Sequence, residues 1–484
     1  MKVPTQSYIS GKWFDSELAT TFPVINPASG DIIAEVADCG AKLTSFAIEG
    51  AADAFPAWKQ KTAKERGEIL LKIKEVLLKN ADHVAEIMTK ECGKPLKESR
   101  VEVAFSASFF DWFSAEGRRA YGETIPPTGP GKAMITIRKP VGVAAFITPW
   151  NFPLGMLARK VSASLAAGCT CVIKPAEDTP LTALAFAQIC HDAGVPAGVV
   201  NVVPCSRKKV VDVGDMLCSH RKVACLSFTG STAVGKSLYA KCSSTMKRVH
   251  MELGGNAPFI VFNDADIDLA VSGLIASKYR NSGQTCITAN KILVQSQIYD
   301  KFMDKLLQAV TKLKVGPGLE PDTDVAAIIN DAQIERIERI VTESIEQGAT
   351  LLHGGVRVST LGPRFFQPTI LTNVKPNVAA YEEEIFGPVA AICKFESEDD
   401  AIKFANDTDK GLAAYAYTNN LRLSWKLADS LEFGMVGINE PIVSTCEAPF
   451  GGIKNSGFGK EGSKHGLDEY TYLKYVAYGN QIPS

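Results

Sequence analysis

Three side chains with complementary chemistry lie on predicted turns, each next to a regular element. Cys286 ends the small, polar run Ser-Gly-Gln-Thr-Cys (282–286), Glu252 lies upstream in Glu-Leu-Gly-Gly, and Asn151 lies in Pro-Trp-Asn-Phe-Pro. A thiol can attack a carbonyl carbon, a carboxylate can take a proton from water, and an amide can stabilise a developing oxyanion. A cysteine alone is more often a buried hydrophobic residue. The three together predict covalent catalysis on a carbonyl compound.

A glycine-rich turn upstream predicts a phosphate site. Residues 230–237, Gly-Ser-Thr-Ala-Val-Gly-Lys-Ser, match the phosphate-loop pattern between a predicted strand and a predicted helix. A helix N-terminus beside small residues offers free N–H groups to a phosphate, without specifying the nucleotide. An ATPase is one interpretation, with Asp264 as a magnesium ligand. A dinucleotide is the other, and we favour it because it gives Cys286, Glu252 and Asn151 a role.

A second glycine pattern lies near the end of the chain. Gly457-Phe-Gly459-Lys-Glu-Gly462 matches GxGxxG, but it follows the glycine-rich stretch 451–456 instead of a strand. A dinucleotide-binding fingerprint opens directly from a strand. We therefore expect a flexible loop here.

The bulk composition is that of a globular enzyme of two or three domains. The chain has 484 residues, 46% of them hydrophobic and 22% charged, with a net charge of −1. This balance predicts no nucleic-acid partner, and no apolar run is long enough to predict a membrane span. Twelve cysteines without a CxxC pair, and six scattered histidines, predict no metal site and a reducing compartment. The first residues lack a leader pattern, so we expect a cytoplasmic protein; a mitochondrial matrix protein would need a leader absent from this sequence.

The pattern of apolar residues predicts an α/β fold. The first sixty residues suggest strands and turns, followed by helices over 63–80 and 96–120 and an exposed ribbon over 132–139. Continuous apolar strands then alternate with helices from 141 to 243, which predicts a parallel, doubly wound sheet. The alternation resumes from 259 to 313, as in a second α/β domain. The tyrosine-rich tail from 470 predicts an extended arm that pairs with another segment or subunit.

Six ordered motifs carry a resemblance to a known family. They are 149–153, 174–177, 228–231, 252–255, 283–286 and 384–388. Over nearly its whole length the chain resembles the aldehyde dehydrogenase superfamily, and within it the succinate-semialdehyde dehydrogenases, by 174–180, 278–286 and 449–470. The resemblance implies an NAD-binding domain (1–122 and 143–253), a catalytic domain (254–446), and an oligomerisation ribbon with the C-terminal tail (123–142 and 447–484). It also implies a homo-oligomer, either a tetramer or a dimer.

The resemblance assigns roles by motif position. Cys286 matches the nucleophile, Asn151 the oxyanion donor and Glu252 the base that activates water. The residues that match the cofactor site are Trp150, Lys174, Pro175, Ala176, Glu177, Gly230, Ser231, Gly235, Glu384 and Phe386. Glu177 matches an acid beside the adenosine ribose, where it would repel a 2′-phosphate, so NAD is expected, with NADP as the weaker alternative.

Two arginines match the grip on a distal carboxylate. Arg159 and Arg280, helped by Ser444, follow Asn151 and precede Cys286 closely enough to line one channel, and a guanidinium fork suits a carboxylate. The alternative is an ordinary surface salt bridge. The resemblance thus implies oxidation of succinate semialdehyde to succinate, as in GABA degradation. Glutarate semialdehyde, a broad range of aldehydes, or a catalytically inactive structural relative are the alternatives. Thr288 stands where many such enzymes carry a second cysteine, which weakens any inference of redox switching.

Overall fold

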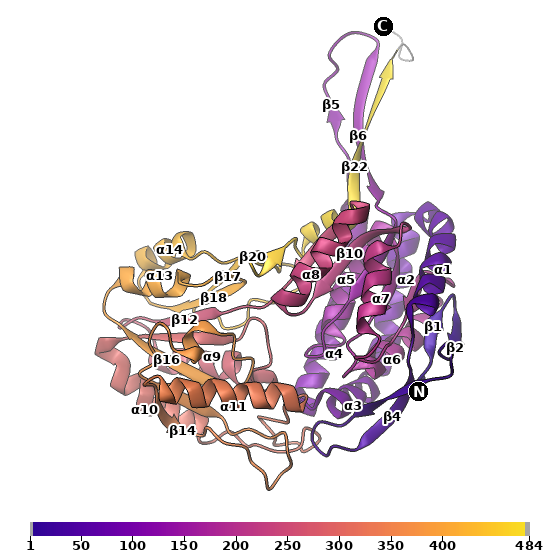
Figure 1. Cartoon of the computed structure of the whole chain (residues 1–484). Coiled ribbons are helices and arrows are strands. Elements are labelled where there is room, and N and C mark those ends of the chain that lie inside the picture. The colour runs from indigo at the N-terminus through magenta and orange to yellow at the C-terminus, as the bar shows by residue number, and fades with distance from the viewer. Residues whose placement is uncertain (1–2, 480–484) are drawn as a thin grey trace.

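Two α/β lobes and a projecting ribbon make up the molecule. The computed structural model describes residues 3–479, and Figure 1 shows the two lobes side by side, with the ribbon rising from one of them. Most of the N-terminal half of the chain forms the lobe below the ribbon, and residues from about 255 to 440 form the other. Each lobe is built around a mixed sheet.

The first sheet has a parallel centre whose strand order reverses beside the predicted phosphate turn. Its order is β2-β1-β9-β8-β7-β10-β11-β21. In that order the strands are Lys12–Phe14, Ser7–Ile9, Val200–Val202, Thr170–Lys174, Val143–Ile147, Val223–Thr229, Arg248–Glu252 and Gly457–Phe458. The five central strands are parallel. Because the chain winds outward in both directions from β7 and β10, a crevice forms at their carboxyl ends, where ligands bind in such sheets.

Helices cover both faces of this sheet, as the apolar pattern predicts. They are α1 (Ala41–Gln60), α2 (Ala63–Lys79), α3 (Ala81–Cys92), α4 (Leu96–Glu116), α5 (Gly155–Ala167), α6 (Pro180–Asp192), α7 (Val210–Ser219) and α8 (Thr232–Cys242). Val143 and Ala145 of β7 join a core with α1, α7 and α8, whereas Ala144 and Phe146 join a core with α2 to α6. Successive strand residues face opposite sides, so both faces of β7 are buried.

The second sheet repeats the parallel arrangement. Its order is β14-β15-β16-β13-β12-β18-β19, and all neighbours except β14 and β15 are parallel. In that order the strands are Thr350–His353, Thr369–Thr372, Val389–Phe395, Ala289–Gln295, Ala257–Val261, Ala413–Tyr417 and Met435–Ile438. Around it pack α9 (Ile267–Lys278), α10 (Tyr299–Val310), α11 (Asp331–Glu346), α12 (Ala379–Glu382), α13 (Glu398–Asn406) and α14 (Leu421–Ser430).

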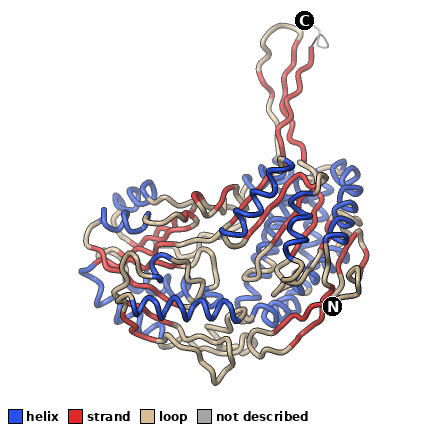
Figure 2. The backbone as a smooth tube through the Cα atoms, in the orientation of Figure 1, coloured by secondary structure: helices blue, strands red, loops and turns tan. Residues whose placement is uncertain are grey.

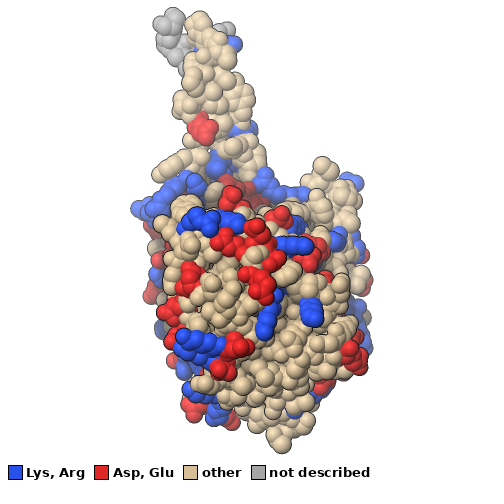
Figure 3. Space-filling view, turned by 90° about the vertical axis from the view of Figure 1, so that its left-hand side faces the viewer, with Lys and Arg blue, Asp and Glu red and all other residues tan. Residues whose placement is uncertain are grey.

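The predicted ribbon and the predicted arm pair with each other. β22 (Thr471–Gly479) runs antiparallel to β6 (Lys132–Pro140) along its whole length, and β5 (Thr124–Ile125) adds a short third strand. The tube in Figure 2 shows this sheet standing clear of both lobes. On the face seen in Figure 3 the ribbon carries few charges, while acidic and basic side chains intermingle on the lobe below. Within residues 3–479, no helix combines the length and apolar content that a membrane crossing requires.

Two expectations from the sequence are wrong. Residues 41–60, part of the first sixty residues that we expected to form strands and turns, form the long helix α1 with Pro56 inside it. The segment expected to be a flexible loop contains β21, which pairs antiparallel with β11 so that Gly457 lies opposite Glu252. Long-range pairing supplies the order that local sequence does not predict for a glycine-rich segment.

Smaller pairings join the C-terminal segment to the body of the molecule. β20 (Ile453–Lys454) pairs with β17 (Lys410–Gly411). A separate pairing, of β3 (Thr21–Ile25) with β4 (Ile32–Ala37), lies in the N-terminal part of the chain. Of the range 447–484, therefore, β20 pairs with β17 outside the two large sheets, β21 is an edge strand of the first sheet, and 471–479 form a strand of the ribbon. Residues 480–484, like residues 1–2, lie outside the described residues. The domain boundaries at 122/143, 253/254 and 446/447 stay a prediction.

Candidate active site

A cavity of about 790 Å³ collects most of the predicted site residues from both lobes. It opens where β7 and β10 end, at the reversal of strand order. The predicted residues that line it are Trp150, Asn151, Arg159, Gly230, Ser231, Arg280, Cys286, Glu384, Phe386 and Ser444. Two of the three predicted catalytic residues, Asn151 and Cys286, thus line the same cavity, although they lie far apart in the sequence.

Cys286 lies on a tightly folded turn after α9. Asn281, Ser282 and Gly283 all have positive φ angles, of 49°, 55° and 74°, so the chain turns sharply just before the thiol. A Cβ atom at Gly255 would lie 2.3 Å from the carbonyl oxygen of Cys286, which explains the need for glycine there. Burial, with Glu384 and Glu252 nearby, raises the pKa of the half-buried Cys286 thiol to about 12.

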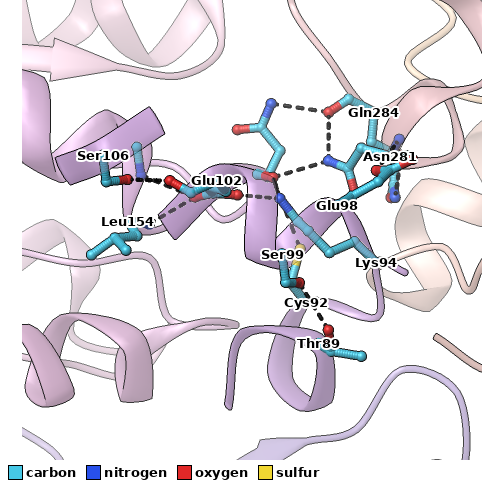
Figure 4. Close-up of polar contacts among 12 residues, drawn as sticks. Thr89, Cys92, Lys94, Glu98, Ser99, Glu102, Ser106, Leu154, Asn281 and Gln284 are labelled. Carbon is cyan, nitrogen blue, oxygen red and sulfur yellow. Dashed lines mark hydrogen bonds and ion pairs between the residues drawn. The ribbon is translucent and has the colours of Figure 1, made fainter. Parts of the chain in front are cut away.

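Asn151 is held by a buried polar cluster between the two lobes. Its side-chain Nδ2 donates to the carbonyl of Gln284 at 3.0 Å, which leaves its second N–H available. The backbone carbonyl of Asn151 accepts hydrogen bonds from Lys94 Nζ at 2.6 Å and from Asn281 Nδ2 at 2.9 Å. Figure 4 shows the Lys94 amine beside Glu102, with Asn281 and Gln284 on its other side. The oxyanion candidate is therefore tied directly to the turn that carries Cys286.

Glu102 anchors the other side of the same cluster. Its Oε1 accepts from the backbone N–H groups of Leu154 and Gly155, at 3.0 and 2.9 Å, where α5 begins. Its Oε2 forms a buried ion pair with Lys94 at 2.5 Å. A carboxylate at a helix N-terminus is favourable, and the pairing satisfies a lysine that would otherwise be a buried unpaired charge.

Glu252 ends β11 and lies beside the cavity. Of the described residues, Leu253 and Gly254 line the cavity but Glu252 does not. Its Oε1 lies 3.3 Å from Nε2 of His250, and its Oε2 has no hydrogen-bond partner within residues 3–479. Burial, together with the negative charge of Glu461, raises the pKa of Glu252 well above its ordinary value. A carboxyl with a raised pKa can accept a proton from water near neutral pH.

The two predicted carboxylate-binding arginines differ in what already holds them. Arg280 is half-buried above the Phe152 ring, and none of the ion pairs in the described part of the chain involves it. Arg159 is buried: its Nη1 donates to Glu461 at 3.2 Å and its Nη2 to Ser444 Oγ at 3.0 Å. Neither is a surface salt bridge. Arg280 is free of ion pairs among the described residues, whereas Arg159 already pairs with Glu461, a carboxylate that it shares with Lys160.

The residues predicted for the pyrophosphate and the nicotinamide ribose border the same cavity. Ser231 caps α8, accepting from Val234 N–H, so the free N–H groups of this helix point out beside Gly230, while Gly235 is buried within the helix. Glu384 Oε1 accepts from the backbone N–H of Gly255 at 2.9 Å. Across from it the rings of Trp150 and Phe386 pack edge-to-face, with centroids 5.5 Å apart. A dinucleotide could be held here by these groups.

Around the predicted adenosine ribose site, Glu177 is shared between two cations. Lys174 Nζ and Arg207 Nε each lie 3.3 Å from one of its carboxylate oxygens. Against the effect of burial, Lys174 holds the pKa of Glu177 below its ordinary value. Pro175 and Ala176, which stand between Lys174 and Glu177 in the sequence, are buried. Sequence reasoning found the lysine and the acid but missed Arg207, which follows β9.

The phosphate-loop pattern has a different meaning here from the one it has in an ATPase. Gly230 and Ser231 line the cavity, but Lys236 and Ser237 are exposed on α8. A phosphate-loop lysine must fold back over the bound phosphates. Within residues 3–479, no three His, Cys, Asp or Glu side chains are grouped to hold a metal ion.

Sequence reasoning also missed several buried charged or titratable residues near the site. They are Lys160, His250, Lys278 and Glu461. The Lys278 amine has no partner among the described residues, and burial lowers its pKa to about 7. One signal was present in the sequence: His250 and Glu252 are two positions apart on a strand, so they share a face.

Comparison with known proteins agrees with this geometry. A family model described as "Aldehyde dehydrogenase family" matches residues 13–476. The chain belongs to the aldehyde dehydrogenase family. This confirms the resemblance carried by the six motifs, and the α/β fold class with it.

Individual relatives within the aldehyde dehydrogenase family are similar over nearly their whole length. "Succinate-semialdehyde dehydrogenase, mitochondrial" of Rattus norvegicus is 49% identical over 474 residues, covering 98% of this chain and 90% of the relative. The solved succinate-semialdehyde dehydrogenase from Burkholderia pseudomallei is 47% identical, with a TM-score of 0.97 over 99% of this chain and 98% of the other. The betaine aldehyde dehydrogenase of Staphylococcus aureus, solved with NAD+, is 33% identical with a TM-score of 0.96, covering 100% of this chain and 96% of the other.

Proposed function

We propose that this aldehyde dehydrogenase oxidises succinate semialdehyde to succinate, with NAD as cofactor, through a thioester on Cys286. The observation that carries the substrate is Arg280: a guanidinium without an ion-pair partner among the described residues lines the same cavity as Cys286 and Asn151. A largely apolar cavity wall with a guanidinium that is unpaired among the described residues selects a short aldehyde that ends in a carboxylate. The names of several relatives, among them that of Oryza sativa subsp. japonica at 48% identity over 476 residues, agree with this substrate.

Acylation uses the residues that line the cavity. The Cys286 thiolate attacks the aldehyde carbon, and the carbonyl oxygen becomes an oxyanion. The second N–H of Asn151 and the backbone N–H of Cys286 stabilise that charge, in a position that the Lys94 and Asn281 contacts keep rigid. Bound NAD would supply the hydride acceptor, and Cys286 would then hold the oxidised substrate as a thioester.

Deacylation uses the acid beside the cavity. Glu252 takes a proton from water as the water oxygen attacks the thioester carbon, and the carbon–sulfur bond then breaks to release the carboxylate and the Cys286 thiolate. The unpartnered Oε2 is the oxygen that can accept this proton. The raised pKa of Glu252 makes it a stronger base than an exposed glutamate.

The cofactor preference rests on Glu177. Its carboxylate can accept from a ribose 2′-hydroxyl and repels a 2′-phosphate. Lys174 and Arg207 weaken that repulsion, and one solved structure at 47% identity is described as an E. coli NADP dependent enzyme. We therefore infer NAD as the better cofactor and NADP as a slower one.

A single assay tests the proposed function. The purified chain is mixed with NAD, and cofactor reduction is followed at 340 nm on addition of succinate semialdehyde, with butanal, glutarate semialdehyde and ATP hydrolysis as comparisons. We expect reduction with succinate semialdehyde at a kcat/KM well above that for butanal, and no ATP hydrolysis. A kcat/KM for butanal equal to that for the semialdehyde would replace the proposal with a broad-specificity enzyme.

We also propose a homo-oligomer, with the ribbon as the contact. Tyr472, Leu473, Tyr475 and Tyr478 are exposed on β22, and a thin sheet standing clear of the body has no core of its own to bury them. Light scattering on the full chain would give the subunit number. The chemistry needs a reduced cysteine, which both the cytosol and the mitochondrial matrix maintain, so cell fractionation decides between the two compartments.

A further inference from the structure

His250, which the chemistry proposed above does not use, forms a buried pair with the candidate base Glu252. Both lie on β11, two positions apart, and both side chains are 1–2% exposed. His250 Nε2 lies 3.3 Å from Glu252 Oε1, while His250 Nδ1 lies 2.9 Å from Ser227 Oγ on the neighbouring strand β10. The imidazole thus bridges the candidate base and a serine, with its ring fully enclosed.

The hydrogen bonds around Ser227 decide which nitrogen of the ring carries the proton. Lys160 Nζ, which can only donate, lies 3.0 Å from Ser227 Oγ. The lysine therefore occupies a lone pair of the Ser227 oxygen, and the Ser227 hydroxyl can donate its own proton to Nδ1 of His250. The neutral ring then carries its proton on Nε2, from which it donates to the ionised Glu252 carboxylate. The chain of donation therefore runs from Lys160 through Ser227 and His250 to Glu252.

The GxGxxG segment encloses this histidine. A Cβ atom at Gly459 would lie 2.2 Å from Cδ2 of His250, and the φ angle of Gly459 is +92°. Both facts require glycine at this position. Two residues later, Glu461 accepts from Lys160 at 2.6 Å and holds the start of the chain of donors in place. In this structure, therefore, the glycine pattern packs against His250, the residue beside Glu252.

We propose that His250 is a positioning residue for Glu252: its Nε2–H holds one carboxylate oxygen and directs the other, Oε2, to the hydrolytic water. This inference rests on the proposed function, because it assigns His250 to the deacylation half of that reaction. The bond also favours the ionised, proton-accepting form of Glu252, since a hydrogen bond donated to a carboxylate stabilises the charge.

Other charges act on the same pair. The titratable side chains that act on His250 and Glu252 include Arg159 and Lys160 from α5, Lys460 and Glu461 from the segment after β21, and Cys286. Glu469 lies beside Gly459, which contacts the His250 ring. Burial, with the charge of Lys160, lowers the pKa of His250 to about 3, so the ring is neutral throughout the working range. Replacing His250 by a neutral amide therefore leaves the charge balance unchanged and alters only the hydrogen bonds.

Two amide substitutions separate the two bonds of the ring. The side-chain amide of asparagine reaches the position of Nδ1, so His250→Asn keeps a partner for Ser227 and loses the donor to Glu252. The amide of glutamine reaches the position of Nε2, so His250→Gln keeps the donor to Glu252. His465→Asn, at a half-exposed histidine, is the matched control. Each full-length variant is mixed with NAD and succinate semialdehyde, and acid-quenched samples are weighed by intact mass to follow the acylated Cys286.

The expected result is a change in deacylation alone. In His250→Asn the acylation burst is retained, and the acid limb of the pH profile for thioester loss moves upward by about one pH unit, the order expected for losing a hydrogen bond to a charged group. The sign follows because the lost bond favoured ionised Glu252, so its pKa rises and a higher pH is needed to form the base. His250→Gln restores most of the original profile, and His465→Asn leaves it unmoved.

The inference is overturned if the profile of His250→Asn does not move, or if the asparagine and glutamine variants shift it equally, because His250 would then be only a packing residue. If His250→Asn does not fold, Ser227→Ala tests the same chain from its other end: it frees the Nδ1 position, and thioester loss should shift in the same direction by a smaller amount. An unmoved profile in that variant also overturns it. Failure of the wild-type chain to form any acyl-enzyme with succinate semialdehyde would instead contradict the proposed function.

Discussion

Arg159 and Glu461 form a buried ion pair, with Nη1 3.2 Å from Oε2, across 302 positions of sequence. Ser444 takes a second N–H of the same guanidinium, and the Phe450 ring lies 4.2 Å from its central carbon. Arg280, which lines the same cavity, takes part in none of the ion pairs among residues 3–479. The two arginines that the sequence presents as equals are therefore unequal: one is free to bind substrate, and the other is also part of the protein interior.

The first prediction concerns these arginines. Arg280→Met should lower kcat/KM for succinate semialdehyde by a factor that corresponds to about 2–5 kcal/mol, the range for breaking a desolvated charge pair. Butanal oxidation should change little. Arg159→Met should lower both activities and the melting temperature, because Glu461 is left with one fewer buried partner. Steady-state kinetics on both aldehydes and a thermal melt make the comparison. Equal losses on both aldehydes for Arg280→Met would mean that Arg280 is structural.

The second prediction concerns the division of labour between Glu252 and Cys286. Glu252→Gln removes the proton acceptor but keeps the shape of the side chain. We expect one burst of reduced cofactor per active site, followed by turnover slower by about 10²–10⁴-fold. Stopped-flow absorbance at 340 nm measures both phases. If the burst also disappears, Glu252 is needed to activate Cys286, and the assignment to deacylation is wrong.

The third prediction follows from the raised pKa of Cys286. In the free protein a thiol with a pKa of about 12 is almost wholly protonated at neutral pH, and only the thiolate reacts with iodoacetamide. Alkylation of Cys286 should therefore be slow at pH 7.5 and rise about tenfold per pH unit, without a plateau below pH 10. The other cysteines are buried, so Cys286 should be the main site of alkylation. Peptide mass spectrometry identifies the alkylated residue. Cys286→Ala is the control. A plateau near pH 8 would show an activated thiolate in the free protein.

The fourth prediction concerns the choice of cofactor. Glu177→Gln should raise kcat/KM for NADP relative to NAD by about tenfold, equivalent to ~1.4 kcal/mol, because it removes a charge that repels the 2′-phosphate. Arg207→Gln is the matched opposite: it removes an exposed cation, 71% accessible, and should lower the NADP ratio. Comparable kcat/KM for NAD and NADP in the unaltered chain would contradict the preference for NAD.

The alternating strands and helices from 141 to 313 could be predicted because parallel strands buried on both faces leave continuous apolar runs. β7 and β12 are buried at every position. The turn after β7 carries Asn151, and the motif that suggests a phosphate site begins at Gly230, directly after β10. The sequence also pointed to Cys286, Asn151 and Glu252 as candidates, since short motifs around them combine unusual glycines with reactive side chains. Local sequence thus predicted the fold class and the family, and it suggested the chemistry that we propose.

Tertiary structure alone decided how the charges are shared. Glu461 lies in a segment that reads as a flexible loop, and its partners Arg159 and Lys160 lie on a helix about 300 positions away. The order of that segment comes from pairing with β11, and the His250 ring beside Glu252 has its second partner, Ser227, on the neighbouring strand β10. Such contacts depend on which distant segments pack together in the fold. The energy of a buried charge is set by those neighbours, and no local pattern records them.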